Sequence, residues 1–177
     1  MTGPALTIES LVAEQHRFVW RVLRGFGLSP ADADDAAQRV FMTAARKLSS
    51  IDPVRARAFV YGVALREANN ARRGLRRRRE VSADSTLDEA EPESRGPEQR
   101  AQLVQAQALL LELLQKLPEP LRRVLILAEL EQLEVPAIAT LEQIPLGTAA
   151  SRLRLARQRF RECLVAAGDR NPFSEQP

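Results

Sequence analysis

The stretch VPAIATLEQIPLGTAASRLRLARQRF, residues 135–160, decides the fold of the second half of the chain. It predicts a short helix, a turn and a second helix. Apolar residues of the second helix recur at i, i+3, i+7, i+10 and i+14, which places them on one stripe: Leu146, Ala149, Leu153, Ala156 and Phe160. This periodicity indicates a helix-turn-helix.

The other side of the second helix is rich in arginine, and residues 147–161 contain no acid. The arginines are Arg152, Arg154, Arg157, Arg159 and Arg161. Their guanidinium groups repel one another unless an anion lies against them, and phosphate is the obvious candidate. The alternative is a solvated amphipathic helix that closes a bundle. A helical wheel places Thr148, Ser151, Leu155 and Gln158 outermost.

Charge is distributed unevenly along the 177 residues, although the formal net charge is only +3. Residues 66–79 contain seven Arg and one Glu, and residues 80–99 contain seven acids and one Arg. The acidic stretch is also rich in Ser, Gly and Pro and poor in apolar residues, which predicts a flexible linker. The chain therefore divides into two halves joined by an acidic linker.

The residue types needed for catalysis or metal binding are scarce. Cys163 is the single cysteine and His16 the single histidine, so neither a disulfide nor a cysteine-based metal site is expected. The sequence shows no phosphate-cradling glycine loop and no nucleophile paired with a base. We therefore expect no enzyme, no catalytic residues, no metal and no cofactor. With no apolar run of membrane length and no signal peptide, we expect a cytoplasmic protein without membrane insertion.

The first half reads as three helices. The first covers about residues 7–24, with Leu11, Val12, Val19, Val22 and Leu23 on its buried side. Ser29-Pro30 opens the second and Asp52-Pro53 the third, which reaches about Arg73, because Ser and Asp cap helices and Pro suits the first turn. Apolar stripes are expected at Ala33, Ala37, Val40, Phe41, Ala44 and Leu48, and at Val54, Ala58, Tyr61, Leu65 and Ala68.

The second half begins with a helix whose apolar positions are Leu103, Ala106, Leu110, Leu113 and Leu117 and which Pro118 stops. Residues 120–131 predict another helix before the helix-turn-helix. We expect an all-α fold of two small helical domains, residues 7–75 and 100–166, joined by a flexible acidic linker at 76–99 and followed by a tail at 167–177.

Two motifs resemble extracytoplasmic-function (ECF) sigma factors of the sigma-70 family. Residues 32–41, DADDAAQRVF, are similar to the region 2 pattern DAEDLVQEVF. Leu117-Pro118, the RRV at 122–124 and IPLGTAASRL at 144–153 are similar to the region 4 pattern LP…REV…IPLGTVKSRL. The order of the motifs, the acidic linker and the length also match, so the resemblance covers roughly residues 8–165.

The resemblance implies a transcription initiation factor that binds core RNA polymerase, through its β′ clamp helices and β flap, and directs it to promoter DNA. The polymerase would meet the outer face of the second helix: Asp35, Gln38, Arg39 and Met42. The −10 element would meet the outer side of the third helix: Arg55, Phe59, Arg66, Asn70, Arg72 and Arg73. Phe59 has an alternative role as a core residue. The loop at 48–54 would capture a flipped base.

The resemblance also assigns the −35 element to the helix-turn-helix, through Thr148, Ser151, Arg152, Arg154 and Arg157. Whether each Arg contacts bases or phosphates stays open. An anti-sigma factor is a further candidate partner.

Some positions depart from the pattern of region 4. Gln143 replaces a usual turn glycine, so a positive φ there would carry modest strain. Glu142 stands where the family usually has an apolar residue. Ala150 stands where the family often has Lys, and Leu155 stands where a basic residue is common. Pro136 lies early in its helix, where it is tolerated.

Two other functions fit parts of the sequence. A stand-alone helix-turn-helix regulator would bind DNA by itself, but it would leave the Asp35/Gln38 face and the linker without a purpose. A helical RNA-binding or scaffolding protein would use its arginines without sequence preference and with a steep salt dependence.

Overall fold

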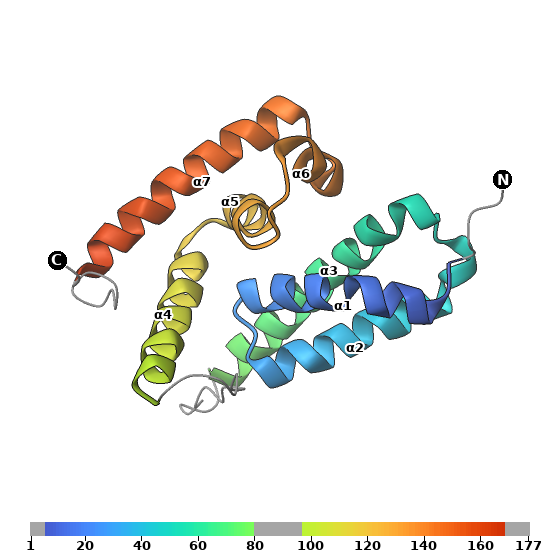
Figure 1. Ribbon diagram of the computed structural model, residues 1–177, viewed down its shortest axis with the longest axis horizontal. Helices are drawn as coiled ribbons and strands as arrows, with labels where there is room; N and C mark the ends of the chain where they lie inside the picture. The colour runs from blue at the N-terminus through green and yellow to red at the C-terminus, as the bar shows by residue number, and fades with distance from the viewer. Residues whose placement is uncertain (1–5, 80–96, 169–177) are drawn as a thin grey trace. The chain divides into compact units, whose positions relative to one another are not determined.

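The computed structural model describes residues 6–79 and 97–168, with the backbone alone for 74–79 and 97–101. Every regular element within these ranges is helical, as expected. The elements form two compact units, one built on helices α1–α3 and the other on α4–α7 (Figure 1). No helix in the described ranges combines the length and the apolar character needed to cross a membrane.

The first unit consists of α1 (Ile8–Gly25), α2 (Pro30–Arg46) and α3 (Ala56–Arg79), with short 3₁₀ turns at Leu48–Ser50 and Pro53–Arg55 between the last two. The start signals in the sequence are confirmed. The hydroxyl of Ser29 accepts a hydrogen bond from the amide of Asp32, 3.1 Å away, and Pro30 is the first residue of α2. A carboxylate oxygen of Asp52 accepts from the amide of Val54 at 3.0 Å. These caps satisfy amides that the first turn of a helix leaves unbonded.

The core of the first unit combines large side chains from α1, Phe41 of α2 and Tyr61 of α3 with many small side chains from α2 and α3. Buried residues of α1 include Leu11, Phe18, Val19, Val22 and Leu23. Helix α2 packs against α3. Most buried residues of these two helices are alanines: Ala33, Ala36, Ala37 and Ala44 on α2, and Ala56, Ala64 and Ala68 on α3. Because alanine is small, the two helices pack closely.

The expected apolar stripe of the third helix was partly wrong. Val54 is 92% exposed, whereas Val60, Val63 and Ala64 are buried. The reason is that Val54 lies in a 3₁₀ turn ahead of α3, so the period of 3.6 residues does not extend back to it. Four other residues that were expected on buried stripes are only half-buried: Val12 on α1, Leu48 in the first 3₁₀ turn, and Ala58 and Leu65 on α3. Tyr61 is buried and its ring lies 6.0 Å from the ring of Phe18.

The second unit consists of α4 (Pro97–Lys116), α5 (Glu119–Leu125), a π-helical segment η3 (Ile126–Leu130), α6 (Val135–Glu142) and α7 (Leu146–Ala167). The helix expected at 120–131 is confirmed over α5 and η3, and its winding changes from α to π at Ile126. Helices α6 and α7 confirm the helix-turn-helix. Its turn passes through Gln143 at φ 54° and ψ 45°. Glycine, which the family pattern usually has at this position, adopts this left-handed conformation most readily.

Helical structure extends into both ends of the segment expected to be a linker. Helix α3 continues past the expected end at Arg73 to Arg79, and α4 already begins at Pro97. The acidic residues 80–96 between them, and the tail at 169–177, lie outside the described residues.

Candidate functional site

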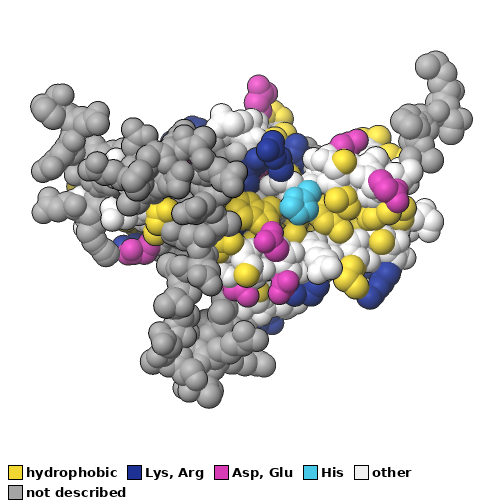
Figure 2. All heavy atoms as spheres, turned by 60° about the horizontal axis from the view of Figure 1, so that its bottom comes forward, with side chains coloured by type: hydrophobic (Ala, Val, Ile, Leu, Met, Phe, Trp, Pro, Cys, Tyr) yellow, Lys and Arg dark blue, Asp and Glu magenta, His cyan; other side chains and the backbone are white. Residues whose placement is uncertain are grey.

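The outer face of α2 carries the residues expected to meet polymerase. Asp35, Gln38 and Arg39 are exposed, and Met42 is 50% exposed, one to two turns farther along the same helix. Beside them His16 of α1 stacks on Phe41, with ring centroids 6.1 Å apart. Figure 2 shows hydrophobic side chains around the histidine on this surface. An exposed Met among polar groups is typical of protein interfaces.

Arg39 has a partner that the sequence did not reveal. Its Nε lies 2.8 Å from a carboxylate oxygen of Glu67 on α3. Arg39 stands where the family pattern has Glu, so this chain places opposite charges on α2 and α3 at that point. The ion pair directs the guanidinium of Arg39 toward Glu67 on α3. We therefore assign Arg39 a weaker role at the interface than its two neighbours.

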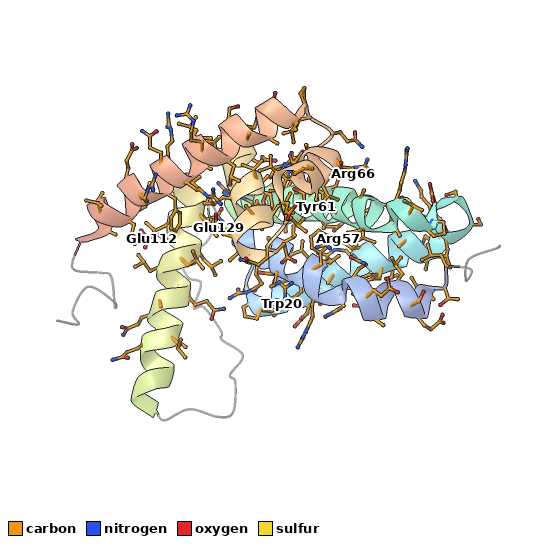
Figure 3. The ribbon with its side chains drawn as sticks, turned by 45° about the horizontal axis from the view of Figure 1, so that its top comes forward. Trp20, Arg57, Tyr61, Arg66, Glu112 and Glu129 are labelled. Carbon is orange, nitrogen blue, oxygen red and sulfur yellow. The ribbon has the colours of Figure 1, made fainter. Side chains whose placement is uncertain are left out.

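Another contact that the sequence did not reveal joins α1 to the start of α2. The indole Nε1 of Trp20 donates to a carboxylate oxygen of Asp34 at 2.8 Å, and the guanidinium of Arg24 lies over the same ring, 5.6 Å from its centroid. Trp20 is labelled in Figure 3. Asp34 directly precedes Asp35, and one of its carboxylate oxygens is thus hydrogen-bonded to α1.

The outer side of α3 brings together most of the residues expected at the −10 element. Arg66, Asn70 and Arg73 are exposed at positions separated by about one helical turn, and Arg66 is labelled in Figure 3. Phe59 and Arg72 are half-buried, so Phe59 keeps part of its ring accessible. Arg55 is exposed but lies in the 3₁₀ turn before the helix.

Arg57, by contrast, is a structural residue of α3. Its guanidinium lies over the ring of Phe18, 4.1 Å from the centroid, in a cation–π contact with α1. The sequence alone placed no such role on it. An arginine within this basic region therefore stabilises the packing of α1 on α3.

The first turns of α7 carry the residues expected at the −35 element. Ser151 and Arg154 are exposed, Thr148 and Arg152 are half-buried, and the Ser151 hydroxyl donates to the carbonyl of Thr148 at 3.1 Å. The opposite side is buried at Ala149, Leu153 and Ala156. The expected stripe was wrong at its first member, because Leu146 opens the helix, has no preceding turn to pack against, and is exposed.

Arg157 is engaged within the second unit. Its Nε lies 2.8 Å from a carboxylate oxygen of Glu129 in η3, and Glu129 is labelled in Figure 3. The acid comes from a segment 28 residues away, so the absence of acids within 147–161 did not exclude it. A phosphate contact by Arg157 would compete with this ion pair.

Glu142, which departs from the family pattern, is matched by a second departure. Arg123 stands where the pattern has Glu, and its Nη2 and Nε lie 2.7 and 3.0 Å from the two carboxylate oxygens of Glu142. The side chain of Glu142 is only 2% exposed. A two-pronged contact of this kind fixes orientation as well as distance. It joins α5 to α6, the first helix of the helix-turn-helix.

Arg122 holds the end of α4. It is buried, and its guanidinium donates to the carbonyls of Leu114 and Leu117 at 2.7 and 2.8 Å and to the side chain of Gln115 at 2.8 Å. Carbonyls at a helix C-terminus have no partners within the helix, and a cation there also meets the negative end of its dipole. Arg122 therefore fixes the bend at Pro118 and is not available to a partner.

An apolar hollow of about 370 Å³ lies within the second unit between α4, η3 and α7. Its lining includes Leu110, Leu114, Ile126, Leu130 and Phe160, with Glu129 and Arg157 at polar positions. The sequence did not reveal this hollow, because its apolar lining residues have the spacing of ordinary core positions.

Comparison with known proteins identifies both units. Residues 11–78 match the family model for Sigma-70 region 2, and residues 107–160 match the model for Sigma-70, region 4. The chain is 31% identical over 159 residues to the RNA polymerase sigma-H factor of Pseudomonas aeruginosa, covering 85% of this chain and 81% of that protein. It is 32% identical over 168 residues to the ECF RNA polymerase sigma factor SigD of Mycobacterium tuberculosis, covering 92% and 76%.

Solved structures share the fold. CnrH, solved in complex with the cytosolic domain of CnrY, has a TM-score of 0.68 and 23% identity, covering 90% of this chain and 88% of that one. The sigma factor RpoE of Bartonella quintana, solved with the anti-sigma factor NepR, has a TM-score of 0.59 and 19% identity, covering 86% and 96%.

Proposed function

The chain belongs to the ECF branch of the sigma-70 family, and we propose that it directs core RNA polymerase to promoters by holding DNA at two separate elements. The observation that carries this proposal is the presence of regions 2 and 4 in one chain, in that order. A stand-alone regulator needs only the helix-turn-helix, so the region 2 match argues against that alternative. The protein acts in the cytoplasm as a binding subunit and catalyses no reaction.

The outer face of α2 is the polymerase-binding surface of our proposal. Asp35 and Gln38 present an acid and an amide to the β′ clamp helices, and Met42 supplies apolar contact area. Arg39 contributes less, because Glu67 already holds it. The apolar hollow of the second unit is the surface we assign to the β flap, since burial of an apolar side chain from the partner would fill it.

The outer side of α3 contacts the −10 element. Arg66, Asn70, Arg72 and Arg73 supply cations and an amide for backbone and base edges. The half-exposed ring of Phe59 supports a stacking role on an unpaired base, and the turns at 48–54 support capture of a flipped one.

Helix α7 lies in the major groove of the −35 element. Thr148 and Ser151 would meet base edges, and Arg152 and Arg154 would contact guanine or phosphate. Arg157 would contact phosphate only by releasing Glu129. We retain residues 7–75 and 100–166 as the two functional domains, with 76–99 as linker, and an anti-sigma factor as a candidate partner that covers these surfaces.

Transcription from a library of genomic fragments tests the proposal. Core polymerase with the purified chain should yield run-off transcripts from a small set of fragments that core alone ignores. The start sites should share two upstream elements. A gel shift with the same fragments separates the alternatives, since tight specific binding by the free chain, unaffected by core polymerase, would support the regulator and contradict the sigma factor.

A further inference from the structure

Leu155 is a large apolar side chain on the face of α7 assigned to DNA. It is 38% exposed, and it follows Thr148 and Ser151 by seven and four residues, so the three share one face of the helix. The buried residues Ala149, Leu153 and Ala156 lie on the opposite side. The fold therefore does not use this leucine as core.

The surroundings of Leu155 are suited to close approach by DNA. Arg154 is exposed next to it in the sequence and Arg152 lies three residues before it, nearly one helical turn, so the face is basic. Ala150 is exposed and small, and a Cβ added at Gly147 would meet nothing within 4 Å. Neither of these two positions adds bulk to the first turns of α7.

The major groove offers one apolar group to such a side chain. The edges of the base pairs present hydrogen-bond donors and acceptors, and thymine alone adds a C5-methyl group. A leucine against a polar base edge or a phosphate would remove water from that group without replacing its hydrogen bond, which is unfavourable. When the leucine packs against a thymine methyl, only apolar surface is removed from water, which is favourable.

We infer that Leu155 is a specificity-determining residue that selects thymine in the −35 element through its methyl group. The inference rests on the proposed function. Where the family pattern commonly has a basic residue able to contact guanine or phosphate, this chain recognises a methyl. Its −35 element therefore contains a thymine opposite Leu155, and the sequence preference at that position differs from that of relatives with a basic residue there.

Replacement of thymine by deoxyuridine tests this inference, because it removes the methyl and leaves every hydrogen-bonding group in place. Holoenzyme assembled from core polymerase and the full chain is titrated against promoter duplexes in which each −35 thymine is replaced singly. One replacement should weaken binding about fourfold, which corresponds to about 0.8 kcal/mol for one buried methyl. The Leu155→Ala variant should bind the thymine and uracil duplexes equally.

Val165→Ala is the matched control. Val165 is an apolar residue of the same helix, 80% exposed and ten residues farther on, about 15 Å along the axis. This variant should keep the full sensitivity to uracil. A Leu155→Arg variant should lose that sensitivity and gain preference for guanine at the same position.

Two outcomes overturn the inference, and only the second also overturns the assignment of α7 to the −35 element. If scrambling the whole −35 element abolishes binding but no single uracil weakens it, or if Leu155→Ala stays sensitive to uracil, methyl recognition by Leu155 is wrong and the sigma-factor assignment stands. If scrambling the element has no effect on the holoenzyme, the assignment of α7 to the −35 element is wrong, and the inference fails with it.

Discussion

The carboxylate of Glu142 and the guanidinium of Arg123 illustrate how much a single pair decides in a small helical unit. Removing one member of a buried ion pair leaves a charge that has lost its water and its partner. Glu142→Gln should therefore lower the free energy of unfolding by about 1–3 kcal/mol, less than for a fully buried pair because Arg123 is partly exposed and also lies 3.8 Å from Glu119. Urea denaturation followed by circular dichroism measures the loss.

Replacing both partners is the control for that substitution. In an Arg123→Met/Glu142→Leu double variant no charge is left buried, so stability should return to within about 1 kcal/mol of the wild type. An unchanged denaturation midpoint for Glu142→Gln alone would show that the carboxylate contributes nothing to stability.

Gln143 is a residue held in the left-handed conformation, with φ 54°. That conformation costs a non-glycine residue about 1–2 kcal/mol. Gln143→Gly should therefore stabilise the chain by about 0.5–1 kcal/mol, after allowing for the extra freedom of glycine in the unfolded state. The same substitution at the exposed helical residue Gln105 should have the opposite sign and cost about 1 kcal/mol. Thermal unfolding that shifts both variants in one direction would contradict this account.

At the scale of the elements, α7 presents arginines in two distinct states. Arg152 is available to DNA, whereas Arg157 is paired with Glu129. Arg152→Ala should lower transcription from promoters of this factor by an amount equivalent to about 1–3 kcal/mol if it contacts a base. Arg157→Ala should lower it less, because its phosphate contact must displace an ion pair.

Arg161→Ala is the control for these two variants, since Arg161 is exposed beyond the first turns of α7. It should leave the choice of promoter unchanged. Sequencing of transcripts from the genomic library measures all three effects, and a promoter profile unchanged in Arg152→Ala would remove Arg152 from the set of reading residues.

Elements with a chemical start or stop signal could be predicted from the sequence. Ser29-Pro30, Asp52-Pro53 and Pro118 act on their own immediate neighbours, so their effect is visible in a short window. The positions of Val54 and Leu146 could not be predicted, because a helical period says nothing of where the helix begins. The ion pairs of Arg39, Arg123 and Arg157 join residues 28, 19 and 28 positions apart, and only tertiary packing brings them together.

At the scale of the whole molecule, the factor must bind polymerase before its DNA-binding helices are useful. Asp35→Ala and Gln38→Ala should each weaken binding to core polymerase while leaving helix content unchanged, because both side chains are exposed and make no core contact. Pull-down of core enzyme by each variant, with circular dichroism of the free chain, measures both quantities.

Gln107→Ala provides the matched control, an exposed amide on α4 of the second unit. It should retain wild-type binding. Recovery of core polymerase by Asp35→Ala and Gln38→Ala at the wild-type level would refute α2 as the polymerase-binding face.

The buried alanines of α2 and α3 have a consequence for both proposed partners of the first unit. In our proposal one helix faces the polymerase and the other faces the −10 DNA, and alanine is the commonest buried residue on both helices. Enlarging one of these side chains would force the helices apart, as overpacking does in any dense core. Such a substitution would keep every binding residue but increase the distance between the polymerase-binding face and the DNA-binding face. Promoter recognition would then be lost through this change in distance, without the loss of any contact residue.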